Sequence, residues 1–131
     1  MVTIIRGSYI LLLSYNPCDI FTHFGVTEMH GLNITDCSLH INNENQSYIA
    51  GWSNFIPKES GEYTNSDPRF VFINLNRCNN EVWTICNIFH ELMHHSLCLH
   101  DYDVENKEEE IISWADNETI EVYKIVKPLL K

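Results

Sequence analysis

The sequence predicts one α+β domain in which a small mixed or antiparallel sheet packs on two helices. Segments rich in β-branched and aromatic residues, which favour strands, occur along the first half of the chain and again at residues 69–75. Two segments with apolar residues at helical spacing follow, one beginning after Asn80 and one ending at Lys127. No repeat or linker interrupts the 131 residues, so we expect a single domain over residues 1–131.

The charge and cysteine content limit the classes of partner. The chain has 8 Lys and Arg against 18 Asp and Glu, a net charge of −10, and its cations are scattered. Nucleic acid and anionic membrane are therefore not expected as partners. The 5 cysteines include no C-x-x-C pair, which favours reduced thiols and a cytoplasmic location.

Residues 2–15 are expected to form the first strand, bent at Gly7. Their apolar run at residues 10–13 is short and lacks a cleavage site, so it predicts a buried strand rather than a secretory signal. No segment of the sequence is apolar over the length that a membrane span requires.

A short helix is expected next. Asn16 can cap it, Pro17 suits its first position, and Gly25 or Gly31 should end it. Residues 35–41 alternate between apolar and polar side chains, as a half-buried strand does.

That second strand should form a hairpin with the next one. Residues 42–45 have turn-forming side chains, and residues 46–56 are predicted to form the returning strand. Residues 57–68 are polar and contain glycine, asparagine and proline, which predicts a loop.

Residues 69–75 are predicted to form a further strand, after which Asn79 or Asn80 can cap a helix. Apolar residues cover about half the girth of this helix, so we expect it to be buried centrally, with its histidines on the partly buried side. The apolar positions are Val82, Ile85, Cys86, Phe89, Met93 and Leu97.

The last helix is expected to start at Val104 or Asn106 and to end at Lys127, before Pro128. Asn106 and Glu109 have the spacing of a capping box. The two helices should pack as an antiparallel hairpin. The predicted buried positions of the last helix are Ile111, Ile112, Ala115, Val122, Ile125 and Val126.

The first of these two helices carries the sequence His90-Glu91-Leu92-Met93-His94, which is the H-E-x-x-H pattern of zinc peptidases. Residues four apart lie on one face of a helix, so both imidazoles can bind one ion. Glu91 lies about 100° round the helix, beside the ion, where it can accept a proton from a metal-activated water. The pattern predicts one Zn²⁺ per chain.

Catalytic zinc sites usually have a third protein ligand. In an antiparallel hairpin, the level of the two histidines on the last helix should be near residues 108–113. Glu108 shares the apolar face of that helix, whereas Glu109 and Glu110 point away from it. Glu108 is the predicted ligand, and Glu118, about two turns further along, remains an alternative with Glu109 and Glu110.

The arrangement of a strand, a short loop, the motif helix and a second helix with a glutamate resembles the gluzincin zinc peptidases. The segments FVFINLN and ICNIFHELMHHSL are similar to small ImmA/IrrE-type metallopeptidases and to small archaeal and phage peptidases. This resemblance covers roughly residues 69–116 and implies a zincin-like fold. It also implies a glutamate ligand followed by alanine seven residues later, which Glu108 and Ala115 match. The asparagine usual at the fourth position is replaced by Ile112.

The resemblance implies a role for residues 69–75 as well. In gluzincins the strand before the motif helix lies at the edge of the sheet and pairs with an extended substrate. The same segment is apolar on both faces, which equally suits a central strand.

Zinc-dependent endopeptidase activity on a protein or peptide substrate is therefore the expected function, with His90, His94 and Glu108 as ligands and Glu91 as the base. The alternative is a catalytically silent, metal-stabilised regulatory or binding module on a peptidase scaffold. A motif that arose by chance is the third possibility.

Several further side chains have open interpretations. His95 points off the metal face and is either structural or at the rim of the cleft. Cys86 or Cys98 could replace the glutamate ligand, and otherwise both are core thiols. The candidate donors to an oxyanion are His100, Tyr102, Tyr63 and Tyr123, among which the sequence does not choose.

Overall fold

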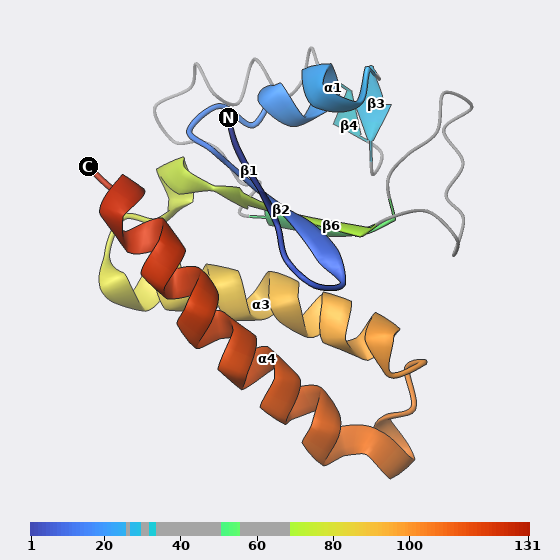
Figure 1. Ribbon diagram of the computed structural model, residues 1–131. Helices are drawn as coiled ribbons and strands as arrows, with labels where there is room; N and C mark the ends of the chain where they lie inside the picture. Colours follow the sequence, from blue (N-terminus) through green and yellow to red (C-terminus); the bar gives the residue numbers. More distant parts are fainter. Residues whose placement is uncertain (26, 30–31, 34–50, 56–68) are drawn as a thin grey trace.

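The computed structural model describes residues 1–25, 27–29, 32–33, 51–55 and 69–131. A four-stranded sheet in the order β1-β2-β6-β5 separates α1 on one side from α3 and α4 on the other (Figure 1). The strands of this sheet are β1 (Val2–Ile5), β2 (Tyr9–Ser14), β5 (Gly51–Phe55) and β6 (Arg69–Asn74). The α-helices are α1 (Asp19–Phe24), α3 (Glu81–Leu99) and α4 (Val104–Val126). The remaining elements are the pair β3 (Glu28–Met29) and β4 (Leu32–Asn33) and the 3₁₀ turns η1 (Leu75–Arg77) and η2 (Lys127–Leu129).

The sheet is mixed, which is one of the two forms expected from the sequence. β2 runs parallel to β6, with Leu11 opposite Val71, and β1 and β5 flank this pair in antiparallel orientation. β6 is therefore a central strand, and the expectation that residues 69–75 form the substrate edge is wrong. The physical reason is its composition, since residues 70–74 are all buried and a strand apolar on both faces needs cover on both sides.

The single strand expected over residues 2–15 is a hairpin. β1 and β2 pair with Ile5 opposite Ile10, and the Arg6 amide donates to the Tyr9 carbonyl at 2.9 Å across the turn. The bend expected at Gly7 is thus a full reversal of the chain. A uniform apolar composition in the two strands does not signal such a reversal in the sequence.

The short helix α1 ends as expected at Gly25, whose φ of 66° is accessible to glycine at little cost. Asn16 lies before the helix, where its side chain accepts a hydrogen bond from the Cys18 amide at 3.0 Å. Of the expected hairpin, β5 lies within residues 46–56. The expected elements at residues 35–41, 42–45 and 57–68 lie outside the described residues.

Alternating side chains of β2 and β6 build two cores. The face toward α3 and α4 holds the larger one, and on the other face Ile20 and Phe21 of α1 are fully buried. Phe24 adds a ring contact to Phe70, with centroids 4.9 Å apart. The members of the larger core include Leu11, Leu13, Val71, Ile73, Ile88, Leu92, Val122 and Val126. α3 is thereby fixed against the sheet on one side and against α4 on another.

The helical hairpin forms as expected, with its own caps. The Asn80 side chain accepts from the Trp83 amide at 2.9 Å at the start of α3. α4 begins at Val104, and its cap is Asp103, which accepts from the Asn106 amide at 3.2 Å. The expected capping box at Asn106 is therefore wrong, because an aspartate three residues earlier takes that role.

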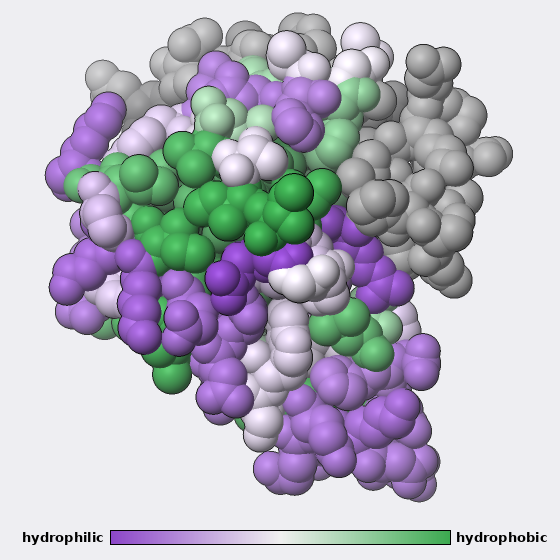
Figure 2. All heavy atoms as spheres, viewed as in Figure 1, coloured by the Kyte–Doolittle hydropathy of each residue, from purple (hydrophilic) through white to green (hydrophobic). Residues whose placement is uncertain are grey.

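The connection between α3 and α4 is strongly acidic. Residues 101–110 contain six acidic residues and one lysine, so these ten residues carry −5 of the net charge of −10. Hydrophilic side chains gather at this end of the molecule in Figure 2, at the lower right. We call residues 101–110 the acidic tip. In the described part of the chain, no helix is long and apolar enough to cross a membrane.

Candidate metal and proton-transfer site

Two histidine rings of α3 converge on one point. His90 and His94 are one helical turn apart, and their ring centroids are separated by 4.9 Å with the planes at 78°. Their Nε2 atoms are 3.2 Å apart. Zinc–nitrogen bonds of about 2.0–2.1 Å in a tetrahedron put neighbouring nitrogens about 3.3–3.4 Å apart. The pair therefore has the spacing of two neighbouring ligands of one zinc ion.

Both rings suit metal binding in other respects. The His90 side chain is 67% exposed, so an ion can reach it from solvent. Partial burial of His94, and then the nearby His90, lower the pKa of His94 below its usual value. Because a metal ligand must be neutral imidazole, a lowered pKa favours binding near neutral pH.

Glu91 lies next to this pair and points into the protein. Its side chain is only 7% exposed, and Oε1 is 3.8 Å from Nε2 of His90. No hydrogen bond to this carboxylate occurs among the described residues. Burial alone raises the pKa of Glu91 to about 7. A carboxylate in this state can both accept and release a proton near neutral pH.

The predicted orientation of α3 is wrong. Three of the six expected core positions, Val82, Ile85 and Cys86, are exposed, and the other three are half-buried. Val82 is 70% exposed, and His90 and His94 are exposed rather than on the buried side. The cause is that the helix has apolar residues on all sides of its circumference, so their periodicity does not identify one buried face. The buried positions are Thr84, Ile88, Glu91, Leu92, His95, Ser96 and Cys98.

The described residues do not assemble a third ligand. No group of three His, Cys, Asp or Glu side chains that could hold a metal occurs within them, and Glu108 is exposed on α4. The Ser96 hydroxyl donates to the Ile111 carbonyl at 2.7 Å, which sets the relative level of the two helices. The two histidines are then level with about residue 115, so Glu108 lies roughly 10 Å away along the helix axis. Whether Glu108 binds metal stays a prediction.

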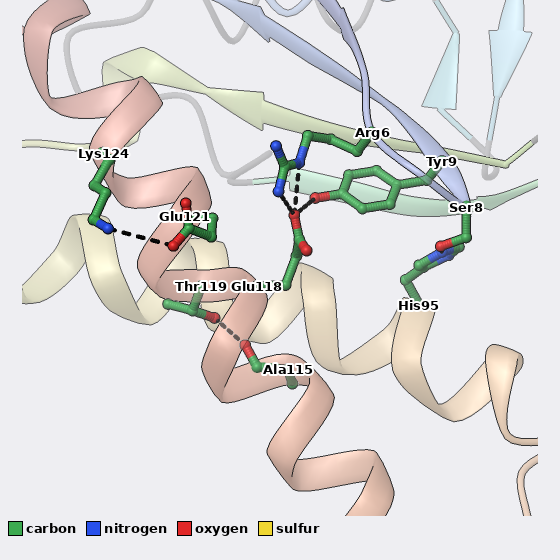
Figure 3. Close-up of polar contacts among 9 residues, drawn as sticks. All are labelled: Arg6, Ser8, Tyr9, His95, Ala115, Glu118, Thr119, Glu121 and Lys124. Carbon is green, nitrogen blue, oxygen red and sulfur yellow. Dashed lines mark hydrogen bonds and ion pairs between the residues drawn. The ribbon is translucent and has the colours of Figure 1, made fainter.

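Glu118 is closer to the level of the histidines, yet its carboxylate faces the β1–β2 turn (Figure 3). Its Oε1 accepts from Arg6 Nε at 2.7 Å and from the Tyr9 hydroxyl at 3.0 Å, and Arg6 Nη2 lies 2.6 Å away. The hydrogen bond to Glu118 is the main reason that the pKa of Arg6 is raised. Burial, followed by the Glu118 charge, raises the pKa of Tyr9. This cluster therefore holds the hairpin against α4.

Sequence reasoning missed the Arg6–Tyr9–Glu118 cluster. Arg6 and Glu118 are 112 positions apart, and nothing local relates them. The only signal in the sequence is that Arg6 is an isolated cation beside an apolar strand. Such a cation needs a partner when the strand is buried.

His95 is structural, which was one of its two interpretations. The ring is completely buried, and its Nε2 lies 3.0 Å from the Ser8 hydroxyl. Its centroid is 5.0 Å from the Tyr9 ring and 5.4 Å from that of Trp114. Burial, and then the charge of Arg69, lower the pKa of His95 to about 4. The ring is therefore neutral at physiological pH.

The candidate oxyanion donors are not distinguished by their positions. The Tyr123 hydroxyl donates to Glu81 at 3.3 Å, and Nδ1 of His100 lies 2.8 Å from a carbonyl oxygen of its own helix. Tyr102 is 59% exposed, and Tyr63 lies outside the described residues.

The two candidate cysteine ligands differ in burial. Cys86 is exposed on α3, whereas Cys98 is buried near the end of the same helix. In the described part of the chain, neither joins the two histidines in a metal-binding group. The burial of Cys98 agrees with its interpretation as a core thiol. The exposure of Cys86 contradicts the same interpretation for that residue.

Comparisons of the chain with models of protein families, with curated proteins and with solved structures found no match. Its function must therefore be inferred from the chemistry of its own residues.

Proposed function

We propose that this chain is a zinc-dependent endopeptidase with a zincin-like arrangement of sheet and helices. The observation that carries the proposal is the joint geometry of α3. Two exposed imidazoles have Nε2 atoms 3.2 Å apart, and a buried carboxylate that accepts no hydrogen bond from the described residues lies 3.8 Å from one of them. Burial of a carboxylate without a hydrogen bond is costly to a fold, which favours a chemical role for Glu91.

His90 and His94 would hold the zinc, which would supply a Lewis acid for the peptide carbonyl and the attacking water. Glu91 would accept one proton of that water as its oxygen bonds to the carbonyl carbon, and would deliver the proton to the nitrogen as the C–N bond breaks. Its pKa of about 7 suits both steps, because the group exchanges a proton readily in either direction near neutral pH.

Glu108 is the proposed third ligand, in keeping with the gluzincin resemblance. Its backbone neighbour Lys107 has φ −124° and ψ 20°, so α4 is interrupted one residue before Glu108. Glu108 follows this interruption and belongs to the main body of α4. It would reach the ion only if α4 shifted along α3 from the level that the Ser96–Ile111 hydrogen bond sets.

The extended substrate is proposed to pair with β5 rather than with β6. In the part of the chain that the structure describes, the sheet ends at β5, which packs next to α3. An outer strand of a sheet can bind an extended peptide by β-augmentation.

Metal binding and cleavage test the proposal separately. Zinc is titrated into untagged, metal-free protein, and hydrolysis of an unfolded protein such as casein is followed by mass spectrometry. We expect one zinc per chain at saturation, loss of zinc in His94→Ala, and retention of zinc without cleavage in Glu91→Gln. Glu108→Gln should weaken zinc binding, whereas Glu110→Gln, an equally exposed neighbour on α4, should not.

Each contrary result has a definite meaning. A native protein that binds no zinc would end the peptidase proposal. Zinc binding with no cleavage that depends on Glu91 would favour the catalytically silent module. Full zinc binding in Glu108→Gln would remove Glu108 from the ligand set and leave His90 and His94 in place.

A further inference from the structure

We propose that His90 and His94 of two copies of this chain share one zinc ion, in an antiparallel dimer of α3 helices that is the resting form of the protein. The inference treats the two histidines as metal ligands and to that extent rests on the proposed function. It goes beyond that function in its partner, a second copy, and in its consequence, since the partner's imidazoles occupy the positions that a third ligand and water would need.

Within the described residues of one chain, α3 supplies two of the four ligands that zinc favours. Zinc favours four ligands in a tetrahedron, and the described residues of one chain bring two nitrogens to the correct separation of 3.2 Å. A two-fold axis through the ion supplies the same two nitrogens again and completes four. The interface that results is isologous, which is the commonest symmetry of soluble dimers.

An exposed aromatic side chain lies on the same side of α3 as the two histidines. Trp83 is 56% exposed, and it precedes His90 by seven residues, about two helical turns. Tyr102, in the connection beyond the other end of the helix, is 59% exposed. Trp83 and Tyr102 lie nine and ten residues from the midpoint of the two histidines, so antiparallel packing about that midpoint brings Trp83 of one copy to the level of the partner's Tyr102. Buried aromatic residues commonly dominate the binding energy of interfaces.

The surface of α3 around the histidines carries little charge. Between Val82 and Leu97 the only acidic residue is Glu91, which is buried, so the α3 surfaces do not repel one another. The acidic tips carry most of the repulsion between two copies. Antiparallel packing separates the tips by about 27 Å along the helix, well beyond a Debye length of about 8 Å. It also places each tip near the N-terminal end of the partner's α3, where the positive end of the helix dipole opposes the charge of Glu81 in the first turn.

These features predict a particular dependence on zinc. Half an equivalent of zinc per chain should produce the dimer, whereas one full equivalent should divide the copies into monomers that each hold one ion. The dimer fraction should therefore rise and then fall as zinc is added. Sedimentation equilibrium and light scattering measure it directly, against the monomer mass of 15.3 kDa.

Two variants test the interface apart from the metal. Trp83→Glu should weaken dimerisation by about tenfold or more while leaving zinc binding to the single chain intact. Glutamate three residues after the Asn80 cap suits the first turn of a helix, so this variant should fold. The matched control is Ile120→Glu, since Ile120 is 55% exposed on α4 away from the histidines, and this variant should dimerise normally. His94→Ala should abolish the zinc-dependent dimer.

The outcomes separate this inference from the proposed function. A monomer at every zinc concentration that still binds one zinc per chain would overturn the dimer and leave the peptidase proposal standing. A dimer that forms equally without zinc, or that persists in His94→Ala, would overturn the shared metal site. Absence of zinc binding would overturn both.

Discussion

Glu91 should make the stability of the metal-free protein fall as pH rises. Its pKa in the fold is about 7, against 4.5 for the free group, so the folded chain binds an extra proton between these values. Stability therefore decreases from about pH 4.5 to about pH 7 and then levels off. The shift corresponds to roughly 3 kcal/mol in the free energy of unfolding. Glu91→Gln should remove this decrease, as urea unfolding at pH 5 and pH 8 with a chelator would show.

The matched control for this experiment is Glu110→Gln, because Glu110 is exposed on α4. It should keep the pH dependence of the native chain. An unchanged slope in Glu91→Gln would mean that Glu91 is ionised in the fold and has a partner there.

Glu118 should contribute to stability through its contacts with Arg6 and Tyr9. Glu118→Gln preserves the shape of the side chain but removes the charge that accepts from both residues, with an expected cost of about 1–2 kcal/mol. Glu121→Gln is the control, because its partner Lys124 is 3.3 Å away on an exposed surface and such pairs contribute little. Urea unfolding of Glu118→Gln, of Arg6→Met and of the double variant gives the coupling energy between the two side chains. A coupling near zero would mean that the contact does not stabilise the fold.

The contrast between these two glutamates shows what a sequence reveals at the scale of residues. Glu91 is recognised because its spacing to His90 and His94 is local and follows from helical geometry. The role of Glu118 depends on a β-hairpin turn 112 positions earlier in the chain, which no local spacing encodes. For the same reason the sequence does not give the level of Glu108 relative to the histidines, since the offset between α3 and α4 depends on the loop and on contacts such as the Ser96 hydrogen bond to Ile111.

At the scale of elements, the start of α3 depends on one side chain. The Asn80 oxygen accepts from the Trp83 amide at 2.9 Å, whereas Asn79 is exposed and makes no such cap. Asn80→Ala should therefore reduce the free energy of unfolding by about 1 kcal/mol, and Asn79→Ala should leave it almost unchanged. Thermal or urea unfolding would measure both. Equal effects of the two substitutions would mean that the helix starts elsewhere.

The extents of the elements were more predictable than their orientations. Strand composition located β6, and the cap and proline signals located the ends of α3 and α4, because these signals are local. The buried side of α3 was not predictable, because the helix has apolar residues on its outer side at Val82 and Trp83 as well as on its inner side at Ile88 and Leu92. Which side packs inward is decided by the match to the sheet and to α4.

At the scale of the whole molecule, charge is distributed unevenly along the helical hairpin. Half of the net charge of −10 lies in the acidic tip, where the one cation, Lys107, contacts Asp101 at 3.7 Å. Like charges held together by folding repel one another more than they do in the unfolded chain. The tip therefore opposes folding at low ionic strength, although acidic residues in the first turn of α4 are partly offset by the helix dipole.

Relief of this repulsion should stabilise the protein measurably. The double variant Glu109→Lys with Glu110→Lys should raise the free energy of unfolding by roughly 0.5–1 kcal/mol in dilute buffer, since both side chains are exposed and their interactions are screened. In about 1 M NaCl the Debye length falls to about 3 Å, and the gain should disappear while the native chain itself becomes more stable. Urea unfolding at both salt concentrations tests this. A gain that persists at high salt would point to altered helix propensity instead, because propensity is not screened by ions.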